Sequence, residues 1–253
     1  MRTTETRPIF RPAPVVPAAP ATPVVPAAPA TPVVRKRTTP TRTGTLGVIA
    51  IVGAGVWIGT VATFHVIRPD LSPGNAYISN YARGDWAWVM RGAFVINAAG
   101  WAAAAIGVRR TLDTARGARL LVVFPAIAAF GMLVAGVFRA DPLGTDSHSL
   151  EGIIHGRAAG AAFIALILFG LVGWAVFRRT DAWAAWAVPS LAFGVLAMVL
   201  LVALTVWPTL VGDGFGWWQR ALAAVLIPGW LGAIGMRLTA RGSIKQLRAA
   251  YRH

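Results

Sequence analysis

Residues 153–177 read IIHGRAAGAAFIALILFGLVGWAVF, an apolar run whose only polar side chains are His155 and Arg157. An α-helix rises about 1.5 Å per residue, so about 20 residues of this kind cross a ~30 Å hydrocarbon core. The run does not alternate polar and apolar residues with a period of two, as a strand of a membrane barrel would. It therefore predicts a membrane-spanning helix.

Five more runs of the same kind lie on either side of it, and short polar or Pro/Gly-marked separators join them. They cover about residues 45–67, 86–108, 119–138, 184–206 and 217–239. Short connections make sequential helices antiparallel neighbours. The sequence predicts an all-α polytopic membrane bundle of six transmembrane helices within residues 45–240.

The composition supports the membrane class. The mean hydropathy is +0.61 and 13% of the residues are charged, whereas a soluble domain carries about 25%. The chain has no cysteine, which excludes disulfides and zinc–thiolate sites.

Residues 1–44 differ in composition from the rest of the chain. They are rich in Pro and Ala and contain VVPAAPATP twice, at 15–23 and 24–32. Proline at this density blocks helix and sheet hydrogen bonds and favours polyproline II. We expect a disordered cytoplasmic tail here, and a second, basic cytoplasmic tail at residues 241–253.

The distribution of basic residues predicts the topology. Eighteen of the 24 Lys and Arg residues lie in the two tails and in the second and fourth separators. Basic loops remain cytoplasmic, so both termini are expected to be cytoplasmic in a multi-pass protein of the plasma membrane. This reading also accounts for the net charge of +15. We therefore expect membrane lipids as partners and no nucleic acid.

Proton-active side chains concentrate in the outer connection between the third and fourth spans. Residues 138–159, FRADPLGTDSHSLEGIIHGRAA, hold several of the chain's nine acidic residues and two of its four histidines. Together with polar groups near the outer ends of spans 1 and 2 they form a candidate ligand-binding cluster. Its members are His65, Asp70, Arg91, Asn97, Asp141, His148, Glu151, His155 and Arg157.

His155 is the central member of this cluster, one turn inside the fourth span. We expect it to face the bundle interior, because an unpaired polar group in lipid is costly. The sequence suggests a carboxylate partner from among Asp70, Asp141 and Glu151. Small residues four apart, at Gly152, Gly156 and Gly160, predict a closely packed neighbouring helix.

A metal site and a haem site are two alternatives for the same residues. His148, Glu151 and His155 share one helix face, but seven residues separate the histidines by about 10 Å. One metal would need more ligands, from Asp141, His65 or Asp70. A haem would need His65 and His155 as ligands from facing helices. The sequence contains no haem motif. We expect no metal and no cofactor. Arg91 and Arg157 leave open an anionic ligand such as a lipid headgroup.

The sequence resembles the prokaryotic membrane family called domain of unknown function 998. The matching residues are Arg68-Pro69-Asp70-Leu71-Ser72 with Tyr77-Ile78-Ser79, Gly136-x-Phe138 with Asp141-Pro142, and Gly152-x-x-His155. The resemblance covers about residues 45–240. It implies an integral membrane protein of about six helices and no known reaction.

Three function classes follow from these observations. The first is a non-enzymatic membrane protein that binds a lipid or small ligand at a polar outer mouth, or an accessory subunit. The mouth would be formed by the connections between spans 1 and 2 and spans 3 and 4. The second is a metal-dependent hydrolase or lipid-modifying enzyme that uses the outer His/Asp/Glu set. The third is a small-molecule transporter, which usually shows an internal repeat and broken helices.

Overall fold

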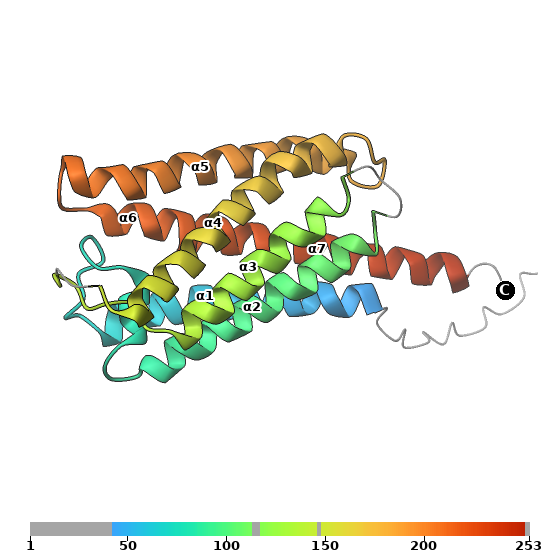
Figure 1. Ribbon diagram of the computed structural model, residues 1–253. Helices are drawn as coiled ribbons and strands as arrows, with labels where there is room; N and C mark the ends of the chain where they lie inside the picture. Colours follow the sequence, from blue (N-terminus) through green and yellow to red (C-terminus); the bar gives the residue numbers. More distant parts are fainter. Residues whose placement is uncertain (1–41, 113–116, 146–147, 251–253) are drawn as a thin grey trace, which may run out of the picture. The chain divides into compact units, whose positions relative to one another are not determined.

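The computed structural model describes residues 42–112, 117–145 and 148–250, with side chains up to residue 241 (Figure 1). The long helices are α1 (Arg42–Ile67), α2 (Ala87–Arg109), α3 (Leu120–Val137), α4 (Leu150–Phe177), α5 (Ala187–Leu210) and α7 (Ile227–Ala250). Shorter elements are η1 (Ile78–Ala82), η2 (Ala184–Trp186), α6 (Phe215–Gln219) and the π-helix η3 (Arg220–Leu226).

The six predicted spans are confirmed. Six helical segments are long and apolar enough to cross a membrane, and the last of them joins α6, η3 and α7 over Phe215–Arg241. The protein is a multi-pass membrane protein, and its described residues form no strand. Helix α7 continues to Ala250, so the backbone of most of the expected C-terminal tail is helical. The expected N-terminal tail lies outside the described residues, apart from the start of α1 at Arg42.

Sequential helices pack as neighbours, as short connections require. Helix α1 packs on α2, α2 on α3, α3 on α4 and α4 on α5, while α7 packs on α1 and η3 contacts α5. The connecting residues 68–86, 138–145 and 211–214 lie at one end of the bundle, which we call the η1 end (Figure 1). There, Gly216 N donates to Gly74 O at 2.7 Å, which joins the first and last of these connections.

Helices α4 and α5 form a wedge. Away from the η1 end they touch through backbone, since a Cβ on Gly170 would lie 2.7 Å from the Cα of Gly194. Ser190 Oγ donates to Gly170 O at 2.9 Å and ties the helices at the same level. Figure 1 shows α4 leaning away from α5 toward the η1 end. The space opened by the wedge is where the candidate site lies.

The last span is widened by the π-helix. The N–H of Ile227 bonds Leu222 O, five residues back, instead of Ala223 O, its α-helical partner. Ala223 O instead accepts a hydrogen bond of 2.7 Å from Trp57 Nε1 on α1. π-bulges of this kind often occur at functional sites. Here the bulge follows directly after Gln219 and includes Arg220 at its first position.

Candidate functional site

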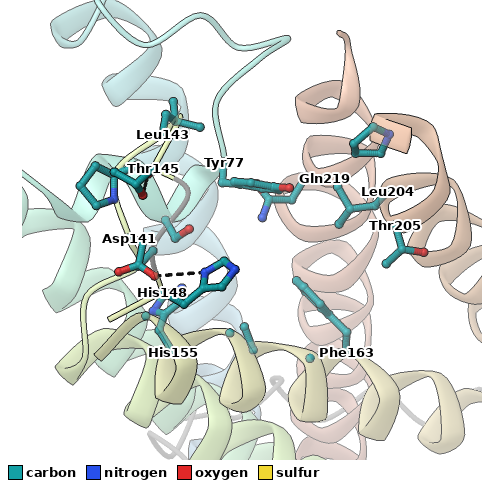
Figure 2. Close-up of a pocket in the computed structure, with 18 of the residues that line it drawn as sticks. Tyr77, Asp141, Leu143, Thr145, His148, His155, Phe163, Leu204, Thr205 and Gln219 are labelled. Carbon is teal, nitrogen blue, oxygen red and sulfur yellow. Dashed lines mark hydrogen bonds and ion pairs between the residues drawn. The ribbon is translucent and has the colours of Figure 1, made fainter. Parts of the chain in front are cut away.

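A pocket of about 640 Å³ lies between α4 and α5 at the η1 end. Figure 2 shows Asp141, His148 and Thr145 on one side of it, with Gln219, Leu204 and Thr205 on the other. Apolar walls continue along the helices. They comprise Ala159 and Phe163 on α4, with Leu201, Leu204 and Pro208 on α5. The pocket therefore combines a polar end with an apolar channel between two membrane-spanning helices.

Glycines of α4 make room for the pocket. A Cβ on Gly156 or Gly160 would meet no atom within 4 Å. The expected close packing of another helix at these two positions is wrong, because α5 has already diverged from α4 here. Gly152 differs from them, since a Cβ there would fall on the carboxylate of Asp141. Its role is to let Asp141, in the connection before α4, approach the helix.

His155 faces the bundle interior as expected and is 6% exposed. Its Nδ1 lies 3.0 Å from both Ala135 O and Phe138 O. The expected carboxylate partner is wrong, because the end of α3 offers carbonyl oxygens that lack helical partners. Since a carbonyl only accepts, Nδ1 carries the proton. In the neutral ring the Nε2 atom keeps its lone pair.

Three polar side chains form the floor of the pocket. Ser79, His155 and Gln219 line both the main pocket and a smaller, apolar-walled void of about 40 Å³. All three residues are nine-tenths or more buried. Gln219 Oε1 accepts a hydrogen bond from Ile78 N at 2.6 Å, which orients the side-chain amide. The other polar atom of this amide is Nε2. Among the described residues, no protein partner meets Ser79 Oγ, His155 Nε2 or Gln219 Nε2. These three atoms differ from Asn97 Oδ1, which is fully buried and has no hydrogen-bond partner.

Asp141 and His148 lie at the rim. Asp141 Oδ1 accepts from Ser149 Oγ at 2.6 Å, and Ser149 in turn caps α4 by accepting from Gly152 N at 3.0 Å. The Ser149 hydroxyl is the main cause that lowers the pKa of the Asp141 carboxyl. His148 Nδ1 lies 3.6 Å from Asp141 Oδ2 and its side chain is largely exposed. Asp141 is therefore ionised at neutral pH and also serves the start of α4.

The other acidic candidates lie outside the pocket. Glu151 pairs with Arg139 at 3.0 Å, and Asp70 pairs with Arg68 at 2.7 Å. Both pairs lie at the surface, where ion pairs contribute little stability. Over the described residues, no three His, Asp or Glu side chains gather closely enough to hold a metal ion.

The intramembrane polar candidates also have structural partners. Arg91 donates from Nε to Gly136 O at 2.9 Å and from a terminal nitrogen to Val137 O at 2.8 Å, so it covers the end of α3. Asn97 donates to Gly53 O at 3.3 Å, which links α2 to α1. Arg157 is exposed and does not line the pocket. An anionic ligand held by Arg91 and Arg157 therefore finds no support in this geometry.

His65 belongs to a separate buried network centred on Arg220. The Arg220 side chain is 5% exposed and donates to His65 Nε2 at 2.8 Å, Ala76 O at 2.8 Å and Tyr81 Oη at 3.0 Å. His65 Nδ1 lies 2.6 Å from Val61 O, so Nδ1 is the protonated nitrogen. The ring thus accepts from the guanidinium, which requires it to be neutral. This network ties α1, η1 and η3 together beside the pocket.

Comparison with known proteins agrees with the resemblance seen in the sequence. The family model described as "Protein of unknown function (DUF998)" matches residues 51–237. The chain belongs to this family. No curated protein and no solved structure matches it.

Of the nine candidate residues of this DUF998 chain, the pocket brings together three, Asp141, His148 and His155. Sequence reasoning missed Tyr77, Ser79, Thr205 and Gln219, which also line the pocket, and Arg220 beside it. Tyr77 and Ser79 stand in a motif that carried the family resemblance, and Gln219-Arg220 are two adjacent polar residues within an apolar span. Both were available signals. Thr205 carried none, because threonine is common in membrane helices.

Proposed function

We propose that this protein binds a membrane lipid in the pocket between α4 and α5. The lipid's polar group lies at the floor formed by Ser79, His155 and Gln219, and its chain follows the apolar wall. The observation that carries this proposal is the wedge, with Gly156 and Gly160 facing open space where two neighbouring helices would otherwise pack.

The dimensions and chemistry of the pocket suit such a ligand. Small-molecule sites measure about 300–1,000 Å³ and are mostly apolar with a few converging polar groups. The pocket of about 640 Å³ has this composition, with Phe163, Leu201 and Leu204 along its apolar side. Buried polar groups without protein partners are costly unless a ligand or water meets them. A lipid between the helices supplies both an apolar chain and a polar group.

The proposed location is the outer leaflet of the plasma membrane. Residues 140–145 of the connection before α4 border the pocket. The excess of basic residues in other connections and in the tails supports an external position for this connection. A non-enzymatic binding role is the simplest reading, and it agrees with the structural tasks of Glu151, Asp70 and Arg91.

Native mass spectrometry of the protein released from mild detergent tests the proposal. Wild-type protein is expected to retain lipid in stoichiometric amount. Gly160→Leu adds a side chain in the pocket, where a Cβ meets no atom within 4 Å. This variant is expected to lose the lipid. Gly59→Leu is the matched control, because Gly59 is exposed on α1 and a Cβ there also meets no atom within 4 Å.

The proposal requires a difference between the two leucine variants. Both should fold, as judged by their melting temperatures in detergent, and only Gly160→Leu should release the lipid. Equal lipid retention by wild type, Gly160→Leu and Gly59→Leu would mean that lipid does not occupy the pocket.

A further inference from the structure

We infer that the pocket selects an uncharged lipid with a free hydroxyl, such as a diacylglycerol or a long-chain alcohol, over a lipid with an anionic phosphate. This inference rests on the proposed lipid site and names the chemical class of its ligand. Three features of the floor and its surroundings lead to it, namely the donor and acceptor pattern, the charge of the lining, and the size of the void.

The floor offers both a hydrogen-bond acceptor and a donor. His155 Nδ1 is held by Ala135 O and Phe138 O, so Nε2 is the nitrogen that presents an acceptor lone pair when the ring is uncharged. Gln219 Oε1 is held by Ile78 N, so the amide presents Nε2 as a donor. A hydroxyl donates one hydrogen bond and accepts others, which satisfies both groups at once. The oxygens of a fully ionised phosphate only accept, and they leave Nε2 of the uncharged His155 ring without a partner.

The charge of the lining disfavours an anion. Within the described part of the chain, Asp141 is the ionised side chain that lines the pocket, and no Arg or Lys lines it. The nearby arginines are directed elsewhere. Arg91 binds carbonyls at the end of α3, and Arg220 binds His65, Tyr81 and two backbone carbonyls. An anion entering the pocket would lose its hydration, meet a carboxylate and find no counterion there.

The void at the floor matches a small group. Its volume of about 40 Å³ is bounded by Ser79, His155, Gln219 and apolar side chains such as Trp57 and Met132. A group the size of water needs about 10–15 Å³ of such volume. A hydroxyl on its carbon therefore fits, whereas a tetrahedral phosphate with four oxygens would have to stay at the wider, carboxylate-bearing rim.

The test compares two lipids with the same chains, dioleoylglycerol and dioleoylphosphatidic acid, added to delipidated wild-type protein in mild detergent. Binding is read by native mass spectrometry and by the shift in melting temperature. We expect dioleoylglycerol to bind roughly tenfold more tightly, since a single unmatched buried polar group is worth about that factor. Phosphatidic acid is expected to give the smaller thermal shift.

Two variants assign the selectivity to the floor. His155→Asn keeps an N–H that can reach the carbonyls of α3 but removes the Nε2 acceptor. Ser79→Ala removes a further hydroxyl from the floor of the pocket. Each should reduce the preference for dioleoylglycerol severalfold. Thr63→Val is the control, because Thr63 Oγ1 is bonded to Gly59 O within α1 and the residue does not line the pocket. It should leave the preference unchanged.

The outcomes separate the two proposals. Equal or tighter binding of phosphatidic acid overturns the hydroxyl selectivity while the lipid site itself stands. A preference that survives both His155→Asn and Ser79→Ala also overturns it. If neither lipid binds wild type more tightly than it binds Gly160→Leu, the lipid site itself is refuted.

Discussion

Gly170 on α4 and Gly194 on α5 bring two membrane-spanning helices into backbone contact, with 2.7 Å between a Cβ built on Gly170 and the Gly194 Cα. This contact fixes the closed end of the wedge. On the same helix, Gly156 and Gly160 face open space. Glycine therefore allows close helix packing at one level of α4 and leaves room for the pocket at another.

The first prediction tests that contrast. Gly170→Ala inserts a methyl where none fits and should lower the free energy of unfolding by about 1–3 kcal/mol, the usual cost of overpacking. Gly160→Ala should be neutral or stabilising by up to about 1 kcal/mol, because alanine favours helix more than glycine. Unfolding in mild detergent with increasing denaturant measures both changes. Equal destabilisation by the two variants would contradict the wedge.

His155 should matter for stability through its Nδ1 atom. His155→Ala removes the donor that meets Ala135 O and Phe138 O and should cost about 1–3 kcal/mol. His155→Asn should restore part of this loss, since its side-chain N–H takes the place of Nδ1. Melting temperatures of the two variants check the prediction. An alanine variant as stable as the asparagine variant would show that these carbonyls do not need the donor.

Arg220 should be among the most sensitive positions of the bundle. Arg220→Met leaves His65 Nε2, Tyr81 Oη and Ala76 O without their donor and should destabilise the protein, because each unpaired buried polar group costs about 1–3 kcal/mol. Arg220→Lys keeps the charge but cannot reproduce the planar set of donors, so only partial recovery is expected. The control is Arg139→Met, which breaks the exposed pair with Glu151 and should cost less than about 1 kcal/mol.

Acid should weaken the start of α4 through Asp141. The Ser149 hydroxyl is the main cause that lowers the pKa of this carboxyl below its ordinary value of 3.8. A carboxyl whose pKa is lowered on folding stabilises the folded state at pH values above its pKa in the unfolded chain. This contribution is lost as the pH falls through its pKa in the folded protein. Stability should therefore hold from neutral pH to about pH 4 and fall below it. Asp141→Asn should be less stable at neutral pH and show a smaller acid-induced loss, measured by unfolding from about pH 6 to about pH 3.

The topology can be tested with reporter fusions. Cytoplasmic signals are expected after Thr111 and Asp181, and an external signal after Gly144, because basic residues concentrate in the connections that hold the first two sites. An external reporter at Asp181 would reverse the orientation and move the pocket to the cytoplasmic leaflet.

Much of the fold could be predicted because each span is defined by local chemistry. Apolar length alone located all six spans, including 153–177, and short separators gave the order of neighbours. The helix ends were less clear. Arg42 and the segment up to Ala250 are helical although they read as tails, since polar residues continue a helix without an apolar signal.

The site could be predicted only in part, because the hydrogen-bond partners of a side chain depend on tertiary geometry. The interior position of His155 followed from its place in the span, but its carbonyl partners depend on where α3 ends. The glycine spacing of Gly156 and Gly160 is the same whether a helix or an open pocket lies opposite. The tilt of α4 decides between the two, and that tilt is set at Gly170, more than two turns away.

The most direct test of the lipid site is an electron cryomicroscopy map of the wild-type protein in lipid nanodiscs. The account predicts elongated density between Gly160 and Leu204, ending at His155 and Gln219, with α4 and α5 apart at that level. It also predicts that Gly160→Leu removes this density. A map in which α4 and α5 pack along their whole length, or in which the space between them holds no lipid density, would contradict it.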